Sequence, residues 1–170
     1  GYSPAIFKAI SKGGCHTGAQ LRAQLTYLTT KSTHILDSRG THDGKKQLSD
    51  AEINRVARRF ENQWNERYSP KLGHTSHLLM AFPVGTSGEE VRDITQAVCE
   101  KFFQGEGSQF DYIAAIHQDR AHPHAHIVLN RRSKDGEMFF LGKDHHFNYD
   151  AFRVAMVEAA QVHGIRLEAT

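Results

Sequence analysis

The sequence predicts an α+β domain, with a mainly antiparallel central sheet of about five strands and helices packed on one side of it. Four capping signatures divide the 170 residues, and short apolar segments rich in β-branched residues lie between them. The elements follow in the order β-α-α-β-α-β-β-β-α, which favours antiparallel pairing over a parallel dinucleotide-binding fold. This length suits one domain over residues 1–170.

Each predicted helix begins at a residue whose side chain can accept a hydrogen bond from the first turn. Thr17, Ser49 and Ser87 each have glutamine or glutamate three residues later, the spacing of a capping box. Asn148 predicts the start of the last helix and Gly164 its end. Behind each cap, apolar residues recur at helical spacing: Leu21, Leu25 and Leu28; Ile53, Val56, Phe60 and Trp64; Val91, Ile94 and Val98; Phe152, Ala155, Met156 and Ala159.

The segments between the helices predict the strands and one long loop. Residues 31–47 are polar and contain glycine, so we expect a loop there. Strands are expected at Ala5–Ile10, His77–Phe82, Phe110–His117 and His124–Arg131, with a weaker candidate at Met138–Leu141.

Composition excludes some classes of protein and favours others. A net charge of +2 is too small to establish a nucleic-acid partner, and no apolar run has the length of a membrane span or signal peptide. Cys15 and Cys99 have no paired spacing, which favours a reducing cytoplasm over a disulfide framework. The chain has twelve histidines, an abundance that indicates a metal or acid–base site.

The most informative histidines lie in the predicted strand 124–131. Side chains alternate along a strand, so His124, His126, Val128 and Asn130 share one face, while a mostly apolar set shares the other. If the apolar set is buried against helices, two imidazoles two residues apart remain on the opposite face. A single strand histidine is usually structural, and a His-x-His pair alone is a weak signal.

His117 strengthens the metal interpretation. It ends the preceding predicted strand, and the six-residue loop before His124 allows the two strands to pair as a hairpin. Three neutral imidazoles with an open coordination position are typical of a catalytic metal site. Asp119 and His122, in the loop, are candidates to orient a ligand imidazole or to accept a proton.

The pattern His-x-Asp-x-x-His-x-His-x-His-x-x-x-Asn, from His117 to Asn130, resembles the third motif of conjugative and mobilisation relaxases, which are HUH-type single-strand DNA endonucleases. It is particularly similar to the relaxases of T-DNA transfer. Residues 77–86, 148–150 and 163–165 extend the resemblance over nearly the whole chain. The resemblance implies a nicking domain that forms the N-terminal part of a longer protein.

The resemblance also implies that Tyr27, on the first helix, attacks DNA. By helical periodicity Tyr27 lies roughly 120° from the Leu21, Leu25 and Leu28 stripe, so the core does not require it. An exposed helix aromatic is the ordinary interpretation of such a position. The metal motif favours the interpretation of Tyr27 as a nucleophile over that of an ordinary exposed aromatic residue.

The implied activity is site- and strand-specific nicking and joining at a plasmid or T-DNA transfer origin, through a 5′-phosphotyrosyl intermediate. In this scheme Asp119 serves as base, His117, His124 and His126 hold a divalent ion, and His122 and Asn130 support them. Manganese or magnesium is the first expectation, and zinc and nickel are compatible with imidazoles. The candidate phosphate contacts are Lys31, Arg120, Arg131 and Arg132.

Single-stranded transfer-origin DNA, accessory relaxosome proteins and a secretion coupling protein are the implied partners, without membrane insertion. The implied location is the bacterial cytoplasm, with export while attached to DNA. Three alternatives remain open: a rolling-circle replication initiator or transposase with the same histidines, a three-histidine hydrolase that activates water, and a non-catalytic DNA-binding module stapled by its metal.

Overall fold

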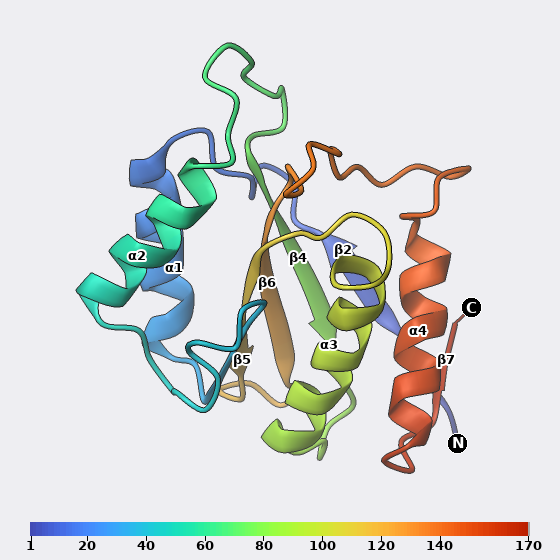
Figure 1. The fold of residues 1–170 in the computed structure, drawn as a ribbon. Helices are drawn as coiled ribbons and strands as arrows, with labels where there is room; N and C mark the ends of the chain where they lie inside the picture. Colours follow the sequence, from blue (N-terminus) through green and yellow to red (C-terminus); the bar gives the residue numbers. More distant parts are fainter. Residues whose placement is uncertain (170) are drawn as a thin grey trace.

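A computed structural model describes residues 1–169 and shows the predicted α+β architecture (Figure 1). One sheet holds five strands in the order β2-β4-β6-β5-β3, and every neighbouring pair is antiparallel. A two-residue parallel pair, β1 with β7, lies apart from it. The elements in chain order are β1 (Ser3–Pro4), β2 (Ile6–Ala9), α1 (Gly18–Thr30), β3 (His34–Asp37), α2 (Asp50–Glu61), β4 (Thr75–Ala81), α3 (Gly88–Phe103), β5 (Tyr112–His117), β6 (His124–Asn130), α4 (Tyr149–Gln161) and β7 (Leu167–Glu168).

The four predicted helices begin at the predicted caps. Ser49 and Ser87 form complete capping boxes at the starts of α2 and α3, and Asn148 accepts a hydrogen bond from the first turn of α4. The box at Thr17 is incomplete. Its hydroxyl accepts from the Gln20 amide, but the Gln20 side chain accepts from the amide of His16 instead.

Helices cover both faces of the sheet, so the expectation that they lie on one side is wrong. One core joins the sheet to α3 and α4, and a second core packs α1 and α2 over the β5 half of the opposite face (Figure 1). Ile127 of β6 belongs to the first core and its neighbour Val128 to the second. Alternate residues of the central strands are therefore buried on opposite faces.

Two strand predictions also need correction. Within the expected loop at 31–47, His34–Asp37 forms the edge strand β3, whose Ile35 and Leu36 are buried in different cores. Met138–Leu141 is not a strand, because its only ladder contact is an isolated bridge between Arg132 and Met138. Phe139 still enters the core from this loop.

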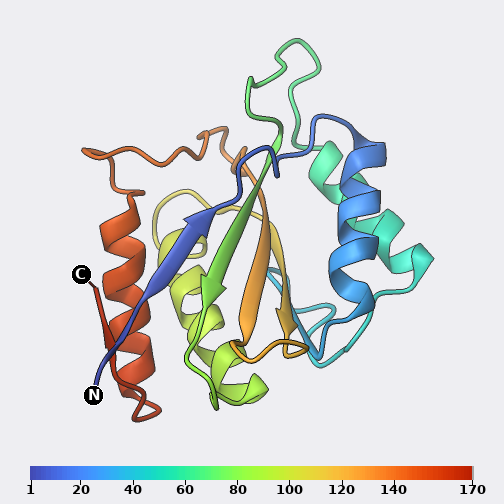
Figure 2. The ribbon, with the colours of Figure 1, turned by 180° about the vertical axis from the view of Figure 1, so that it is seen from behind.

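The helices α1 and α2 leave half of their sheet face uncovered. Figure 2 shows β2 and β4 unobstructed on this side, with α1 and α2 displaced towards the β5 edge. No helix among residues 1–169 is both long and apolar enough to cross a membrane. His77 of β4 lies on this uncovered half-face, and His124 and His126 of β6 lie beside it on the same side of the sheet.

Candidate active site

Three histidines converge where the β5–β6 hairpin turns. His117 of β5 lies directly opposite His124 of β6, and His126 follows two residues along β6 on the same face. The ring centroids of His117 and His126 are 4.5 Å apart, and those of His124 and His126 are 6.3 Å apart. The hairpin pairing inferred from the sequence is therefore present.

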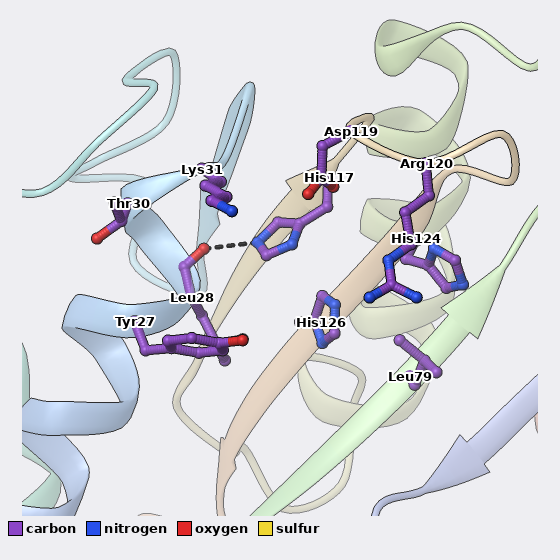
Figure 3. Close-up of a pocket in the computed structure, with 10 residues that line it drawn as sticks. All are labelled: Tyr27, Leu28, Thr30, Lys31, Leu79, His117, Asp119, Arg120, His124 and His126. Carbon is purple, nitrogen blue, oxygen red and sulfur yellow. Dashed lines mark hydrogen bonds between the residues drawn. The ribbon is translucent and has the colours of Figure 1, made fainter.

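A pocket of about 430 Å³ opens between these rings and the last turns of α1 (Figure 3). Tyr27 lies on the helix side of the pocket with 78% of its side chain exposed, and its hydroxyl points towards His126. The helix periodicity separates this ring from the buried leucine stripe, as predicted. The lining residues are Tyr27, Leu28, Thr30, Lys31, Leu79, His117, Asp119, Arg120, His124 and His126.

A hydrogen bond joins α1, the helix that carries Tyr27, to the hairpin. The Nε2 atom of His117 lies 2.6 Å from the carbonyl oxygen of Leu28, so Nε2–H donates and Nδ1 keeps the free lone pair. Because Leu28 is the neighbour of Tyr27, this contact holds the backbone of α1 beside the hairpin at the position of Tyr27.

The site favours the neutral form of His124 and His126. Burial, reinforced by the neighbouring His117 and His77, lowers the pKa of His126 to about 3. Burial also lowers the pKa of His124, with a contribution from Arg120. Neutral imidazole is the form that ligates a metal ion.

The donor set fits a divalent metal in type, since imidazoles suit zinc, nickel and similar ions, and burial favours the neutral, ligating form of His124 and His126. Within residues 1–169, however, no group of three or more histidine, cysteine or acidic side chains encloses a position for an ion. The reason is visible at His117, whose Nε2 is bonded to the Leu28 carbonyl. Ligation through all three rings needs His117 to present Nδ1 or to turn away from that carbonyl.

His77 is a site residue that sequence reasoning missed. It lies on β4 opposite Val128, and its Nε2 atom is 2.9 Å from Nδ1 of His126. Burial lowers the pKa of His77, so both rings are neutral and one donates to the other. If His126 donates, its Nε2 atom carries the lone pair available to a metal. Only the pairing of β4 with β6, which the sequence did not define, places His77 here.

Three other predicted residues line the pocket. Asp119 and Arg120 lie in the exposed β5–β6 turn, and Lys31 follows the end of α1. Figure 3 shows Arg120 next to His124 and Lys31 on the α1 side of His117, with Asp119 beside His117. None of the three has an ion-pair partner within residues 1–169, which leaves both cations accessible to an anion.

The structure places four predicted residues outside this pocket. His122 is exposed in the turn, with Nδ1 3.1 Å from the carbonyl oxygen of Phe82. Arg131 is 8% exposed, and its guanidinium donates to the carbonyl oxygens of Phe139 and Gly73. Arg132 lines a separate hollow near the end of α2.

Asn130, the fourth, was expected to support the imidazoles but lies four residues along β6 from His126. It is fully buried, accepts a hydrogen bond from Nε1 of Trp64 and donates to the carbonyl oxygen of Phe60. These contacts attach the end of α2 and the segment after it to the sheet.

A family model described as relaxase, MobA/VirD2-like, nuclease domain, matches residues 27–165. The T-DNA border endonucleases VirD2 of Agrobacterium fabrum and Rhizobium rhizogenes are each 32% identical over 97% of this chain. The chain spans 39% and 40% of the length of these two curated relatives.

A solved structure shares the fold at lower sequence identity. It is described as the MobM relaxase domain (MOBV; Mob_Pre) bound to 26nt pMV158 oriT DNA. The similarity covers 98% of this chain and 91% of that one, with a TM-score of 0.59 and 10% identity. At this identity the match supports the architecture.

Proposed function

Because the chain belongs to the relaxase family of MobA/VirD2-like nuclease domains, we propose that it nicks and rejoins one DNA strand at a transfer origin. The observation that carries the proposal is Tyr27, which faces three imidazoles across one pocket. An exposed phenol has no packing role there, and it lies where a phosphate could reach the phenol and the imidazoles together.

The proposed reaction uses Tyr27 as nucleophile. Its phenolic oxygen attacks a phosphodiester phosphorus, the P–O3′ bond breaks, and a 5′-phosphotyrosyl link and a 3′-hydroxyl result. A phenol is a weak nucleophile at neutral pH, so a base must remove its proton. Asp119 is the candidate acceptor on this pocket. The 3′-oxygen gains a proton as it leaves, and the reverse steps rejoin the strand.

The remaining pocket residues bind and orient the substrate. Lys31 and Arg120 would contact the phosphates flanking the scissile bond, because both cations line the pocket. His117, His124 and His126 would hold a divalent ion, manganese or magnesium first, with zinc or nickel also suited to the ligands. When bound, the ion supplies positive charge that stabilises the transition state of phosphoryl transfer.

The same proposal includes the partners implied by the resemblance of the histidine motif. These are single-stranded transfer-origin DNA, accessory relaxosome proteins and a secretion coupling protein. The protein would act in the bacterial cytoplasm and could be exported while attached to DNA.

The test is formation of the covalent adduct. A 3′-labelled single-stranded DNA library with a random core is incubated with protein and manganese, and denaturing gels reveal labelled DNA attached to protein. We expect the wild type and Tyr68→Phe to form the adduct, because Tyr68 is exposed and does not line the pocket. Tyr27→Phe and chelator-treated protein should not. Cleavage retained in Tyr27→Phe would instead support a hydrolase that activates water.

A further inference from the structure

A second hollow lies on the same uncovered half-face, next to the pocket. Its volume is about 830 Å³, and it is formed by the loop between β2 and α1, the first half of α1 and residues 71–77. His77 lines this hollow and is hydrogen bonded to His126, which lines the pocket with Tyr27. The two cavities therefore meet at one imidazole pair.

The wall formed by α1 runs from one cavity into the other. Gln20 and Gln24 line the second hollow, and Tyr27 and Lys31 line the pocket. Positions three or four apart share one face of a helix, so these residues form one stripe along α1 and its end. The helix thus forms a continuous wall.

The floor is continuous too. On β4, Thr75 and His77 line the second hollow and Leu79 lines the pocket. Lys8 of β2 lies opposite Leu79 in the register and is exposed on the same face. Figure 2 shows no helix crossing β2 and β4 on this side. The two cavities therefore lie next to each other on one face of the sheet, with the His77–His126 pair between them.

The chemistry of the second hollow suits a polyanion. Lys12 and Lys71 line it, both are exposed, and neither has an ion-pair partner within residues 1–169. The same described part of the chain contributes no acidic residue to the lining. Phosphates of single-stranded nucleic acid bind to such unpaired cations in a groove.

The backbone at Lys12 provides a second, independent observation. The chain turns between Ile10 and Gly13, and Lys12 within this turn has a φ of 59°, the only positive φ of a non-glycine residue among residues 1–169. Glycine or asparagine occupies such a position at lower energy. Lysine at this position therefore costs backbone energy that glycine would not, and Lys12 is exposed at the lining of the hollow.

We propose that the second hollow is a nucleotide-binding subsite for the strand whose scissile phosphate lies at Tyr27, with Lys12 and Lys71 each contacting a phosphate. This inference rests on the proposed function, because the strand must enter the pocket. Thr75 is four residues from Leu79, or about 13 Å along β4. One strand of duplex DNA rises about 3.4 Å per nucleotide and an extended single strand rises more, so the subsite takes a phosphate at most roughly four nucleotides from the scissile bond.

Binding of fluorescein-labelled (dT)20, followed by anisotropy at several salt concentrations, tests the subsite. Removal of two phosphate contacts in Lys12→Gln/Lys71→Gln should reduce the slope of log K against log[salt] by about 1.4, at about 0.7 per contact. The matched control Lys101→Gln/Arg153→Gln, on α3 and α4 at the opposite face, should keep the wild-type slope. Wild-type slopes in both doubles would overturn the subsite.

Lys12→Gly distinguishes the contribution of the lysine side chain to DNA binding from the effect of its backbone conformation on stability. We expect it to keep or raise the thermal midpoint while the salt slope falls by about 0.7. A slope equal to that of the wild type would overturn the role of Lys12.

Photocrosslinking of 4-thiothymidine oligonucleotides, read by mass spectrometry, should modify residues 11–16 or 71–77. Crosslinks confined to other segments would also overturn the subsite.

The outcomes keep the two proposals apart. If the wild type forms the covalent adduct with the random-core library but the lysine double variant binds (dT)20 with the wild-type salt slope, the subsite fails alone. If the wild type never forms an adduct, the nicking proposal fails, whatever the slopes show.

Discussion

Replacing Asn130 with alanine tests whether this motif residue acts through the fold or through the pocket. Its side chain is fully buried and joins β6 to the end of α2, through Nε1 of Trp64 at 2.7 Å and the carbonyl oxygen of Phe60 at 3.2 Å. The alanine variant leaves Nε1 of Trp64 without its hydrogen bond, whereas the Phe60 carbonyl oxygen loses one bond and still accepts from the backbone amide of Gln63. Neither partner lines the pocket with Tyr27.

The expected magnitude follows from these two lost bonds. The donor left unsatisfied costs about 1–3 kcal/mol and the other lost bond about 0.5–1.5 kcal/mol, so we expect the free energy of unfolding to fall by roughly 2–4 kcal/mol. For a domain of this size each kcal/mol lowers the midpoint by about 2–4 °C, giving a shift of roughly 5–15 °C. The exposed Asn54, which accepts from Nε of Arg22, is the matched control, and its alanine variant should change stability by about 0.5 kcal/mol or less.

Urea denaturation followed by tryptophan fluorescence measures this effect, because Trp64 is the only tryptophan of the chain. Adduct formation by Asn130→Ala, assayed well below its midpoint, should stay within a fewfold of the wild type. A variant that unfolds like the wild type yet loses the adduct would refute the reasoning and return Asn130 to a role at the imidazoles.

Three further predictions concern metal binding, pH and the loop before α1. His77→Ala should weaken manganese binding about 10–100-fold in calorimetry and should change the ring ¹⁵N chemical shifts of His126. Unchanged ring shifts would contradict a role of His77 in positioning His126. In metal-free protein, the free energy of unfolding should fall as pH falls from about 6.5 towards 3, because His126 takes up a proton in the unfolded state and resists it in the folded state. Between pH 8 and 5 this loss amounts to at most ~2 kcal/mol. The His126→Gln variant should lose less stability over the same range, as measured by urea titration at each pH. Gly14→Ala should destabilise the domain by about 1–3 kcal/mol in urea titrations, because the new Cβ would collide with the carbonyl oxygens of Leu72 and Thr75. Gly107→Ala is the control, because a Cβ at residue 107 meets no atom within 4 Å, and its stability should equal that of the wild type.

The sequence predicted the parts of the fold that depend on local signals. Caps at Ser49, Ser87 and Asn148 are satisfied within one turn, so their spacing alone locates three helices. The β5–β6 hairpin was equally predictable. The alternation of polar and apolar side chains in residues 124–130 and the short turn before them define it without contributions from distant residues.

Features that depend on distant partners were not predictable in this way. Strand β3 is four residues long and buried on both faces, which is too short to show a period. His77 reaches the site only because β4 pairs with β6, and Arg131 is withdrawn from the surface by carbonyl oxygens of residues 73 and 139. The continuous apolar run Tyr112–Ile116 was an available sign that helices cover both faces.

The three imidazoles on the β5–β6 hairpin fall within ten consecutive residues, whereas the phenol comes from a helix about ninety residues earlier. The residues proposed to hold an ion are thus close together in the sequence, and the proposed attacking group is brought to them by tertiary assembly. Under this proposal, loosening the first thirty residues would leave the hairpin with its imidazoles but without the phenol that would hold DNA covalently. Evolution could therefore exchange the proposed attacking side chain, or reposition its helix, without rebuilding the hairpin.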